Sequence, residues 1–285
     1  MSLFKFLFGS KAENSEEAKK VDDEKSFDVL KYDGVRALKI GQADYAVKCL
    51  NAALEISDDL ECHDYLSQAL MRAGDLPGAI EQVNILSEAQ PENVDIYLRK
   101  ADIAYMMEDY KMVGDACEKA LLYDSDNALA LYMYGRACMA MGDDANAVAM
   151  FTKSLAATDS FGDAMLLRGR AYLRMGDVDS AADDAEHLMR LNPDNEDVLL
   201  LSAAVARQRG ENDEALNIYN KVIDLNPFCT AAFEQRAALR REMGDDAGAD
   251  ADIDALREIN PESDDQDIAR RVDESRRAID PFGIG

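Results

Sequence analysis

A glycine followed by an acidic residue recurs along this chain at multiples of 34 residues. The glycines directly followed by Asp or Glu in this series are Gly74, Gly142, Gly176, Gly210 and Gly244. Glu108 fills the missing place in the series, and Gly41 lies 33 residues before its first member. A fixed period of this length is typical of repeat architectures. It predicts seven units, which begin near Phe27, Leu60, Val94, Ala128, Gly162, Glu196 and Thr230.

Two further columns of the repeat hold small residues. The eighth residue of each unit is Gly34, Ser67, Ala101, Gly135, Gly169, Ala203 or Ala237. The twentieth is Ala46, Ala79, Val113, Ala147, Ala181, Ala215 or Ala249. Small side chains let two helices approach closely. Apolar residues between these columns recur with helical spacing, and four units end at a proline, which stops a helix. Each unit therefore predicts a pair of helices.

Over residues 27–261 these columns resemble the tetratricopeptide repeat family. The departures are Glu108 at a turn glycine and three units without the final proline. The resemblance implies an all-α, right-handed superhelical solenoid of seven helical hairpins, with the first helix of each hairpin on the concave face. A stack is also what the physics requires, because a single hairpin cannot bury its apolar faces alone.

The two ends of the chain are expected to differ from the repeats. Residues 262–285 predict a capping helix and tail, because Ser263 to Gln266 forms a capping-box pattern and Ile268, Val272 and Ile279 share one face. Residues 1–26 predict a flexible N-terminal segment with an apolar tip. The tip consists of Leu3, Phe4, Phe6, Leu7 and Phe8. Three roles stay open for residues 1–9: docking on protein, touching a membrane, or none.

The charge of the chain excludes several partners. It carries 57 Asp and Glu against 31 Lys and Arg, a formal net charge of −26. Such a chain repels phosphate backbones and anionic lipids, so we expect no nucleic-acid partner, and membrane contact only through residues 1–9. Its five cysteines are scattered without paired spacing, which indicates reduced thiols and a cytoplasmic protein.

The sequence offers no reactive constellation. The two histidines, His63 and His187, fall in different units. Asp250, Asp252 and Asp254 imitate the start of a calcium loop, but the loop's later glycine and glutamate are missing. Phosphate-binding and dinucleotide-binding motifs do not occur. We therefore predict a protein without catalytic residues, bound metal or cofactor. The acidic residue after each turn glycine is expected to cap the second helix.

The resemblance also indicates which residues face the concave side. Those positions are rich in Met and Tyr in the N-terminal half and in Arg in the C-terminal half. Arg136 and Arg170 share a place in neighbouring units, and neither has an acidic residue three or four positions away. Because guanidinium groups bind carboxylates bidentately, they favour a partner with acidic residues beside apolar ones. The residues expected to bind it are Met71, Tyr105, Tyr132, Arg136, Met139, Arg170, Arg174, Arg207 and Arg241.

Two readings of these residues stay open. The arginines bind a partner, or Asp163, Asp197 or Glu234 on adjacent helices neutralise them. The Met and Tyr residues line a peptide groove, or they pack between units. The sequence therefore predicts a non-catalytic protein-interaction adaptor that binds a peptide or helix. The alternative is a structural scaffold that self-associates through its ends or convex face, and the oligomeric state stays open.

Overall fold

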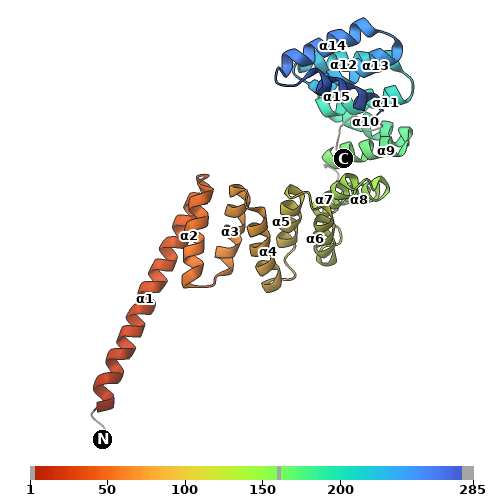
Figure 1. Ribbon diagram of the computed structural model, residues 1–285. Helices are drawn as coiled ribbons and strands as arrows, with labels where there is room; N and C mark the ends of the chain where they lie inside the picture. Colours follow the sequence, from red (N-terminus) through yellow and green to blue (C-terminus); the bar gives the residue numbers. More distant parts are fainter. Residues whose placement is uncertain (1–3, 159–161, 278–285) are drawn as a thin grey trace. The chain divides into compact units, whose positions relative to one another are not determined.

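The computed structural model describes residues 4–158 and 162–277, with side chains from Lys20 to Ser275 (Figure 1). Over these residues the chain forms 15 α-helices and no strand. Consecutive helices pair as seven hairpins, and a last helix follows them. The prediction of an all-α helical-repeat solenoid is confirmed.

The chain divides into two compact units, residues 1–125 and 126–285. The N-terminal unit contains α1 (Phe4–Lys39), α2 (Ala43–Ile56), α3 (Leu60–Ala73), α4 (Leu76–Ala89), α5 (Val94–Met106) and α6 (Tyr110–Tyr123). The C-terminal unit contains α7 (Ala128–Ala140), α8 (Asp144–Ala157), α9 (Gly162–Met175), α10 (Val178–Leu191), α11 (Glu196–Gln208), α12 (Asn212–Leu225), α13 (Thr230–Met243), α14 (Asp246–Ile259) and α15 (Asp265–Arg277). From the second hairpin to the seventh, the first helix begins at the residue that the sequence period predicts. These starts run from Leu60 of α3 to Thr230 of α13.

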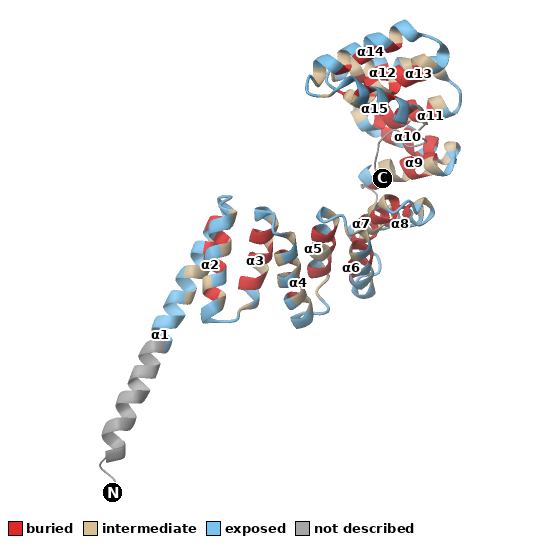
Figure 2. Ribbon diagram, viewed as in Figure 1, coloured by how far each residue is buried: buried red, intermediate tan, exposed pale blue. Residues whose placement is uncertain are grey.

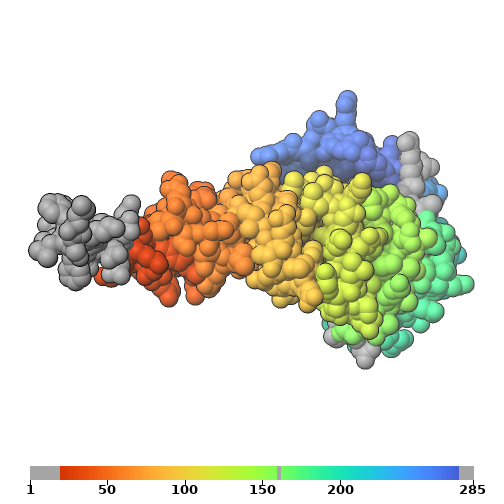
Figure 3. Space-filling view, turned by 90° about the horizontal axis from the view of Figure 1, so that it is seen from below, coloured from red at the N-terminus to blue at the C-terminus, as the bar shows by residue number. Residues whose placement is uncertain are grey.

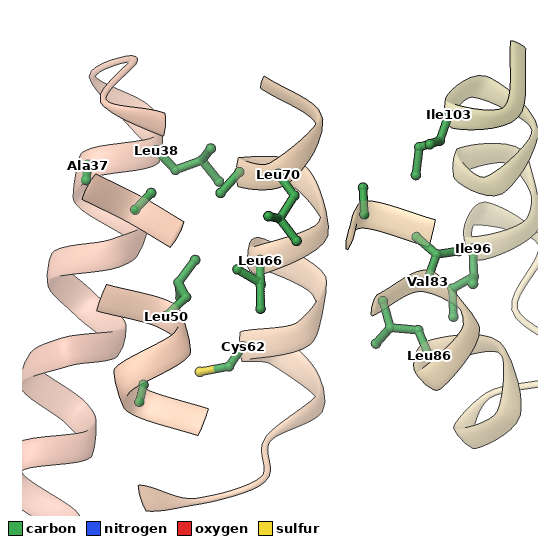
Figure 4. Packing of buried hydrophobic residues seen from close by; sticks show 14 residues of the cluster. Ala37, Leu38, Leu50, Cys62, Leu66, Leu70, Val83, Leu86, Ile96 and Ile103 are labelled. Atoms are coloured by element: carbon green, nitrogen blue, oxygen red, sulfur yellow. The ribbon is translucent and has the colours of Figure 1, made fainter. Parts of the chain in front are cut away.

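Most buried residues are apolar and form the core. Buried residues, drawn red in Figure 2, occur in both units. In the N-terminal unit, Leu50 of α2 and Leu66 of α3 are almost fully buried in one cluster, which continues through Val83 of α4 to Ile103 of α5 (Figure 4). The consecutive repeats of this unit lie side by side along the chain in the space-filling view (Figure 3). Each repeat therefore packs mainly on its sequence neighbours, as in a solenoid.

The eighth residue of a unit must be small where a second helix crosses it. A Cβ atom on Gly135 would lie 2.6 Å from the ring of Phe151, and one on Gly34 would lie 2.7 Å from Leu50 Cγ. Both neighbours are fully buried, so they have no room to move aside. This close approach explains the small-residue column.

The turns explain the glycine and aspartate columns. The turn glycines have φ between 76° and 82°, a left-handed conformation that suits glycine. Glu108 takes the same place with φ of 58°. The aspartates that follow accept a hydrogen bond from a backbone N–H three residues further on, as Asp109 does from Met112. Asp75, Asp143, Asp177 and Asp245 do the same. The acidic column thus caps the second helices, as predicted.

Both chain ends are helical in the structure. The N-terminal segment, for which the sequence predicts flexibility, is part of α1 from Phe4 onward. Residues 10–26 contain no proline or glycine and are rich in Ala, Glu and Lys, which favour helix even without a buried face. The side chains of the apolar tip lie outside the described residues. At the other end, α15 is capped by Asp264, whose Oδ1 accepts from the N–H of Asp267 at 2.7 Å, and not by Ser263.

Candidate functional site

Arg170 of α9 reaches α11, the first helix of the next hairpin in the C-terminal unit. Its Nη2 donates to Asp197 Oδ1 of α11 at 2.6 Å. The arginine is 7% exposed, whereas the Asp197 side chain is 58% exposed. One of the acidic neighbours that the sequence offered therefore pairs with Arg170. Asp197 therefore stands largely in water, whereas the arginine that it pairs with is almost fully buried.

Arg174 belongs to the same helix and contacts two further elements. Its Nε donates to Asp144 Oδ2 of α8 at 3.1 Å, and its Nη2 donates to the backbone oxygen of Met139 at 3.3 Å. Both charged side chains are about five-sixths buried. The guanidinium thus joins α9 to the end of α7 and the start of α8. Arg174 is a structural clamp between two hairpins.

Arg207 of α11 spans three elements. Its Nη2 donates to Glu242 Oε1 of α13 at 2.7 Å, and its Nη1 donates to the backbone oxygen of Ser275 in α15 at 2.9 Å. Arg241 of α13 is half-buried, and its side chain has no hydrogen bond or ion pair within the described part of the chain. Of the arginines on α11 and α13, it is therefore the one with a free charge.

Tyr132 and Arg136 of α7 lie together. The guanidinium carbon of Arg136 is 5.6 Å from the centre of the Tyr132 ring, within the range of a cation–π contact. Tyr132 also packs against Phe151, with ring centres 6.0 Å apart. Met139 differs from the expectation, because it is 1% exposed and belongs to the core. Its side chain is buried in a cluster with residues of α8 and α9, so it is not available to a partner.

The apolar residues expected in the N-terminal unit are partly buried. Met71 of α3 packs against the core cluster of the unit. Tyr105 of α5 meets Tyr110 of α6 edge to face, with ring centres 5.6 Å apart. Both side chains therefore contribute to packing and still expose part of their surface.

Helix α13, the first helix of the last hairpin, is covered by α15 of the same chain. Helix α15 packs on α13 and less closely on α14 (Figure 1). Its Ile268 and Val272 are buried with Ala238 of α13 in one cluster. Arg271 of α15 pairs with Glu234 of α13 at 3.2 Å. Burial raises the pKa of Glu234, and Arg271 opposes that rise in part. The sequence predicted that the C-terminal helix caps the core of the last repeat. It did not predict the contacts of α15 with Arg207 of α11 and Glu234 of α13.

The described part of the chain shows little that could carry chemistry. Within it no three His, Cys, Asp or Glu side chains gather in a geometry that could hold a metal ion. His63 is engaged between Gln82 and Asp58, at 2.7 and 2.8 Å from its ring nitrogens. Its neighbour Cys62 is fully buried. Among the described helices, none combines the length and apolarity that a membrane crossing requires.

Family models decide what kind of protein this is. Two models, each described as a tetratricopeptide repeat, match residues 66–111 and 166–228 and residues 130–165, together about half of the chain. The chain belongs to the tetratricopeptide repeat family. Members of this family typically serve as non-catalytic interaction modules, so this chain is a protein-interaction adaptor in the general sense. No curated protein sequence matches it.

Solved structures share the fold of this tetratricopeptide repeat protein at low sequence identity. A tetratricopeptide repeat protein from Parabacteroides merdae ATCC 43184 has a TM-score of 0.71 at 15% identity, covering 89% of this chain and all of that one. PilW, described as a widely conserved type IV pilus biogenesis factor, has 0.63 at 18%, covering 72% and 95%. YrrB, described as a TPR protein with an unusual peptide-binding site, has 0.52 at 21%, covering 66% and 96%.

Proposed function

We propose that this protein is a non-catalytic adaptor that holds a peptide segment or helix of a partner on the first helices α7, α9 and α11. The observation that carries the proposal is α15, a helix already seated on the equivalent helix α13. It is held there by two buried apolar residues, one ion pair and one backbone hydrogen bond from Arg207. The description of YrrB as a peptide-binding TPR protein also supports this use of the fold.

The chemistry of α15 indicates what a partner segment would carry. Apolar side chains would lie on Tyr132 in the C-terminal unit, and Met71 and Tyr105 offer partly exposed apolar surface of the same kind within the N-terminal unit. Acidic side chains would meet Arg136 on α7, and half-buried Arg241 where a segment extends as far as α13. Arg170 joins them by exchanging the exposed carboxylate of Asp197 for one from the partner. Arg174 and Arg207 are held by Asp144 and Glu242, so they would shape the surface and contribute less to affinity.

Affinity measurements on the full chain test this proposal. Capture from the native cell with mass spectrometry would first identify a partner, and its affinity would then be measured for wild type, Arg136→Ala, Arg170→Ala and the double variant. Losing charge-assisted hydrogen bonds of about 1.5–3 kcal/mol each should weaken binding at least ten-fold in the double variant. Rising salt should weaken the wild type more than the double variant.

A matched control separates the surface from the net charge. Arg257 on α14 pairs with exposed Asp254 and Asp265, away from the first helices. Arg257→Ala changes the net charge as Arg170→Ala does, and it should leave the affinity unchanged. Equal affinities and equal salt slopes for wild type and the Arg136→Ala/Arg170→Ala variant would contradict the proposal.

A structural scaffold is the second candidate, and one observation favours it. Helix α1 of the first hairpin leaves Val29 60% and Tyr32 72% exposed. Large exposed apolar groups on one helix mark contact surfaces. Light scattering of wild type and a Val29→Ser/Tyr32→Ser variant tests it, and the scaffold role requires a larger wild-type assembly. Deletion of residues 1–9, followed by scattering and membrane fractionation, tests the N-terminal tip separately.

The proposal includes a cytoplasmic location. All five cysteines are buried free thiols in the structure, which suits a reducing compartment. Fractionation of the native cell tests the location.

A further inference from the structure

Two hairpins of the C-terminal unit contain the same buried ion pair. Arg168 donates from Nε and Nη2 to Asp184, sixteen residues later, at 2.9 and 2.6 Å. Arg236 donates to Asp252, also sixteen residues later, at 2.5 Å from Nη2 to Oδ1. Both aspartates are at most 5% exposed. The cation thus sits on the first helix of the hairpin, and its carboxylate sits on the second.

The same two arginines also reach back to the preceding hairpin. Arg168 Nη1 donates to Thr152 Oγ1, sixteen residues earlier, at 3.2 Å. Arg236 Nη1 donates to Asn220 Oδ1, sixteen residues earlier, at 2.6 Å. A cation at this repeat position therefore has two acceptors. The neutral one lies sixteen residues earlier in the sequence, and the carboxylate lies sixteen residues later.

Lys100 occupies this repeat position in the N-terminal unit, 68 residues before Arg168. Its Nζ donates to Asn84 Oδ1, sixteen residues earlier, at 2.8 Å, so the rear contact is kept. The residue sixteen positions later is Ala116, which is 3% exposed. The carboxylate that completes the site in the other two hairpins is therefore replaced by a methyl group. A cation and its first acceptor remain, and the anion is missing.

A pocket of about 630 Å³ lies between α4, α5 and α6 of the N-terminal unit, and both Lys100 and Ala116 line it. Lys100, Lys111 and Lys119 all line it, and these are all the lysines between Lys48 and Lys153. Within the described chain none of the three forms an ion pair. Three ammonium groups of a strongly acidic chain thus line one pocket.

The other lining residues define the rest of the ligand. Tyr97 and Tyr123 stack with ring centres 6.3 Å apart, and Tyr123 is 48% exposed. They offer an aromatic wall beside the lysines. Two carboxylates also line the pocket. Asp109 uses its Oδ1 to cap α6, and Asp115 pairs with none of the three lysines within 4.0 Å. The pocket keeps an excess of positive charge.

We propose that this pocket binds an acidic peptide segment, whose Asp or Glu carboxylate takes the position that Asp184 and Asp252 hold in their own hairpins. An apolar or aromatic residue beside it packs on Tyr97 and Tyr123. A carboxylate is the expected anion because the same chain places one at this point twice. The site lies on α4, α5 and α6 and is separate from the surface proposed on α7, α9 and α11, so different variants test the two.

Titration of the ¹⁵N-labelled full chain tests the site. The probes are an acetylated, amidated hexapeptide that alternates Glu and Phe, the same peptide with Gln for Glu, and inorganic phosphate. The Glu peptide should shift the amide signals of α5 and α6 saturably, at least ten-fold more tightly than the Gln peptide. Lys100→Gln keeps the hydrogen bond to Asn84 and should weaken binding about ten-fold. Lys153→Gln, an exposed lysine outside the pocket, should bind like wild type.

Ala116→Asp tests the replacement directly, because it restores the missing carboxylate within the chain. It should abolish peptide binding and raise the melting temperature above that of Ala116→Asn. If it does not fold, Lys100→Gln still decides the outcome. The proposal is overturned if Lys100→Gln binds like wild type, or if Lys153→Gln loses as much affinity. It is also overturned if phosphate binds these helices as tightly as the Glu peptide.

Discussion

Arg207 of α11 donates a hydrogen bond of 2.9 Å to the backbone oxygen of Ser275 near the end of α15. The last carbonyl groups of a helix have no partner within the helix, so this guanidinium caps α15 from another hairpin. The same arginine pairs with Glu242 of α13. Arg207, which belongs to the first helix of its hairpin, thus holds α15 in place over the first helix of the last hairpin.

Loss of Arg207 should loosen α15. In Arg207→Ala the capping bond disappears, and a hydrogen bond to a charged group contributes about 1.5–3 kcal/mol. Amide hydrogens of α15 should therefore exchange roughly ten-fold faster or more, while α9 and α10 stay protected. Arg209→Ala is the matched control, because Arg209 lies two residues away and its pair with Asp179 is exposed. Equal protection of α15 in both variants would show that the cap contributes nothing.

The buried carboxylate of Asp252 should contribute far more to the free energy of unfolding than the exposed carboxylate of Asp254. Asp252 is 1% exposed and accepts from Arg236 and Arg240, whereas Asp254 pairs with Arg257 in water. Removing one partner of a buried pair costs about 3–5 kcal/mol. An exposed pair contributes at most about 1 kcal/mol. Urea unfolding of Asp252→Ala and Asp254→Ala on the same helix measures this difference, and similar losses would contradict it.

Glu108 should be replaceable by glycine with a gain in stability. Its φ of 58° lies in the left-handed region that the equivalent glycines occupy. That conformation costs an L-residue roughly 1–2 kcal/mol, partly offset by the greater freedom of glycine when unfolded. Glu108→Gly should therefore raise the free energy of unfolding by about 0.5–1 kcal/mol.

Gly74 provides the reverse test in the same unit. It has φ of 82°, and no atom lies within 4 Å of a Cβ built on it. Gly74→Ala therefore isolates the backbone strain, and it should lower stability by about 1 kcal/mol. Thermal unfolding of both variants measures the two effects, which must have opposite signs.

The sequence predicted the fold well because the repeat rests on local requirements. A left-handed turn needs Gly142, a helix start needs a cap such as Asp143, and a close crossing needs Gly135. Each requirement depends on a few neighbouring residues and recurs in register. The sequence analysis did not predict the helix over the N-terminal segment, because the polar composition suggested a flexible segment, although the same residues have high helix propensity.

The candidate site was harder to predict because its contacts join distant residues. Arg170 has no acidic neighbour on its own helix, but Asp197 stands 27 residues later on α11. Arg174 meets Asp144, which lies 30 residues earlier. Such pairs depend on how helices are placed relative to one another, and spacing within one helix does not show them. Met139 was wrongly expected to be accessible, because spacing along α7 does not show that residues of α8 and α9 bury it.

Cys62 should be unreactive in the folded chain. It stands in the first turn of α3, where a helix N-terminus ordinarily lowers the pKa of a thiol. Here burial, and then the carboxylate of Asp59, raise the pKa of Cys62 to about 12. The other four cysteines are buried as well. Iodoacetamide at pH 8 should therefore modify no cysteine in the native protein and all five in urea, as mass spectrometry would show.

The raised pKa of Cys62 also predicts how stability depends on pH. In the unfolded chain the thiol ionises above about pH 8.5, whereas the folded chain keeps it protonated up to about 12. The folded state then binds more protons, so this contribution to stability is complete below about pH 8.5 and declines as pH rises. Urea unfolding of wild type and Cys62→Ala at pH 7.5 and pH 10 measures it. The cavity in Cys62→Ala is the same at both pH values, so the wild type should lose about 1–2 kcal/mol more than the variant. Equal losses would mean that Cys62 has an ordinary pKa.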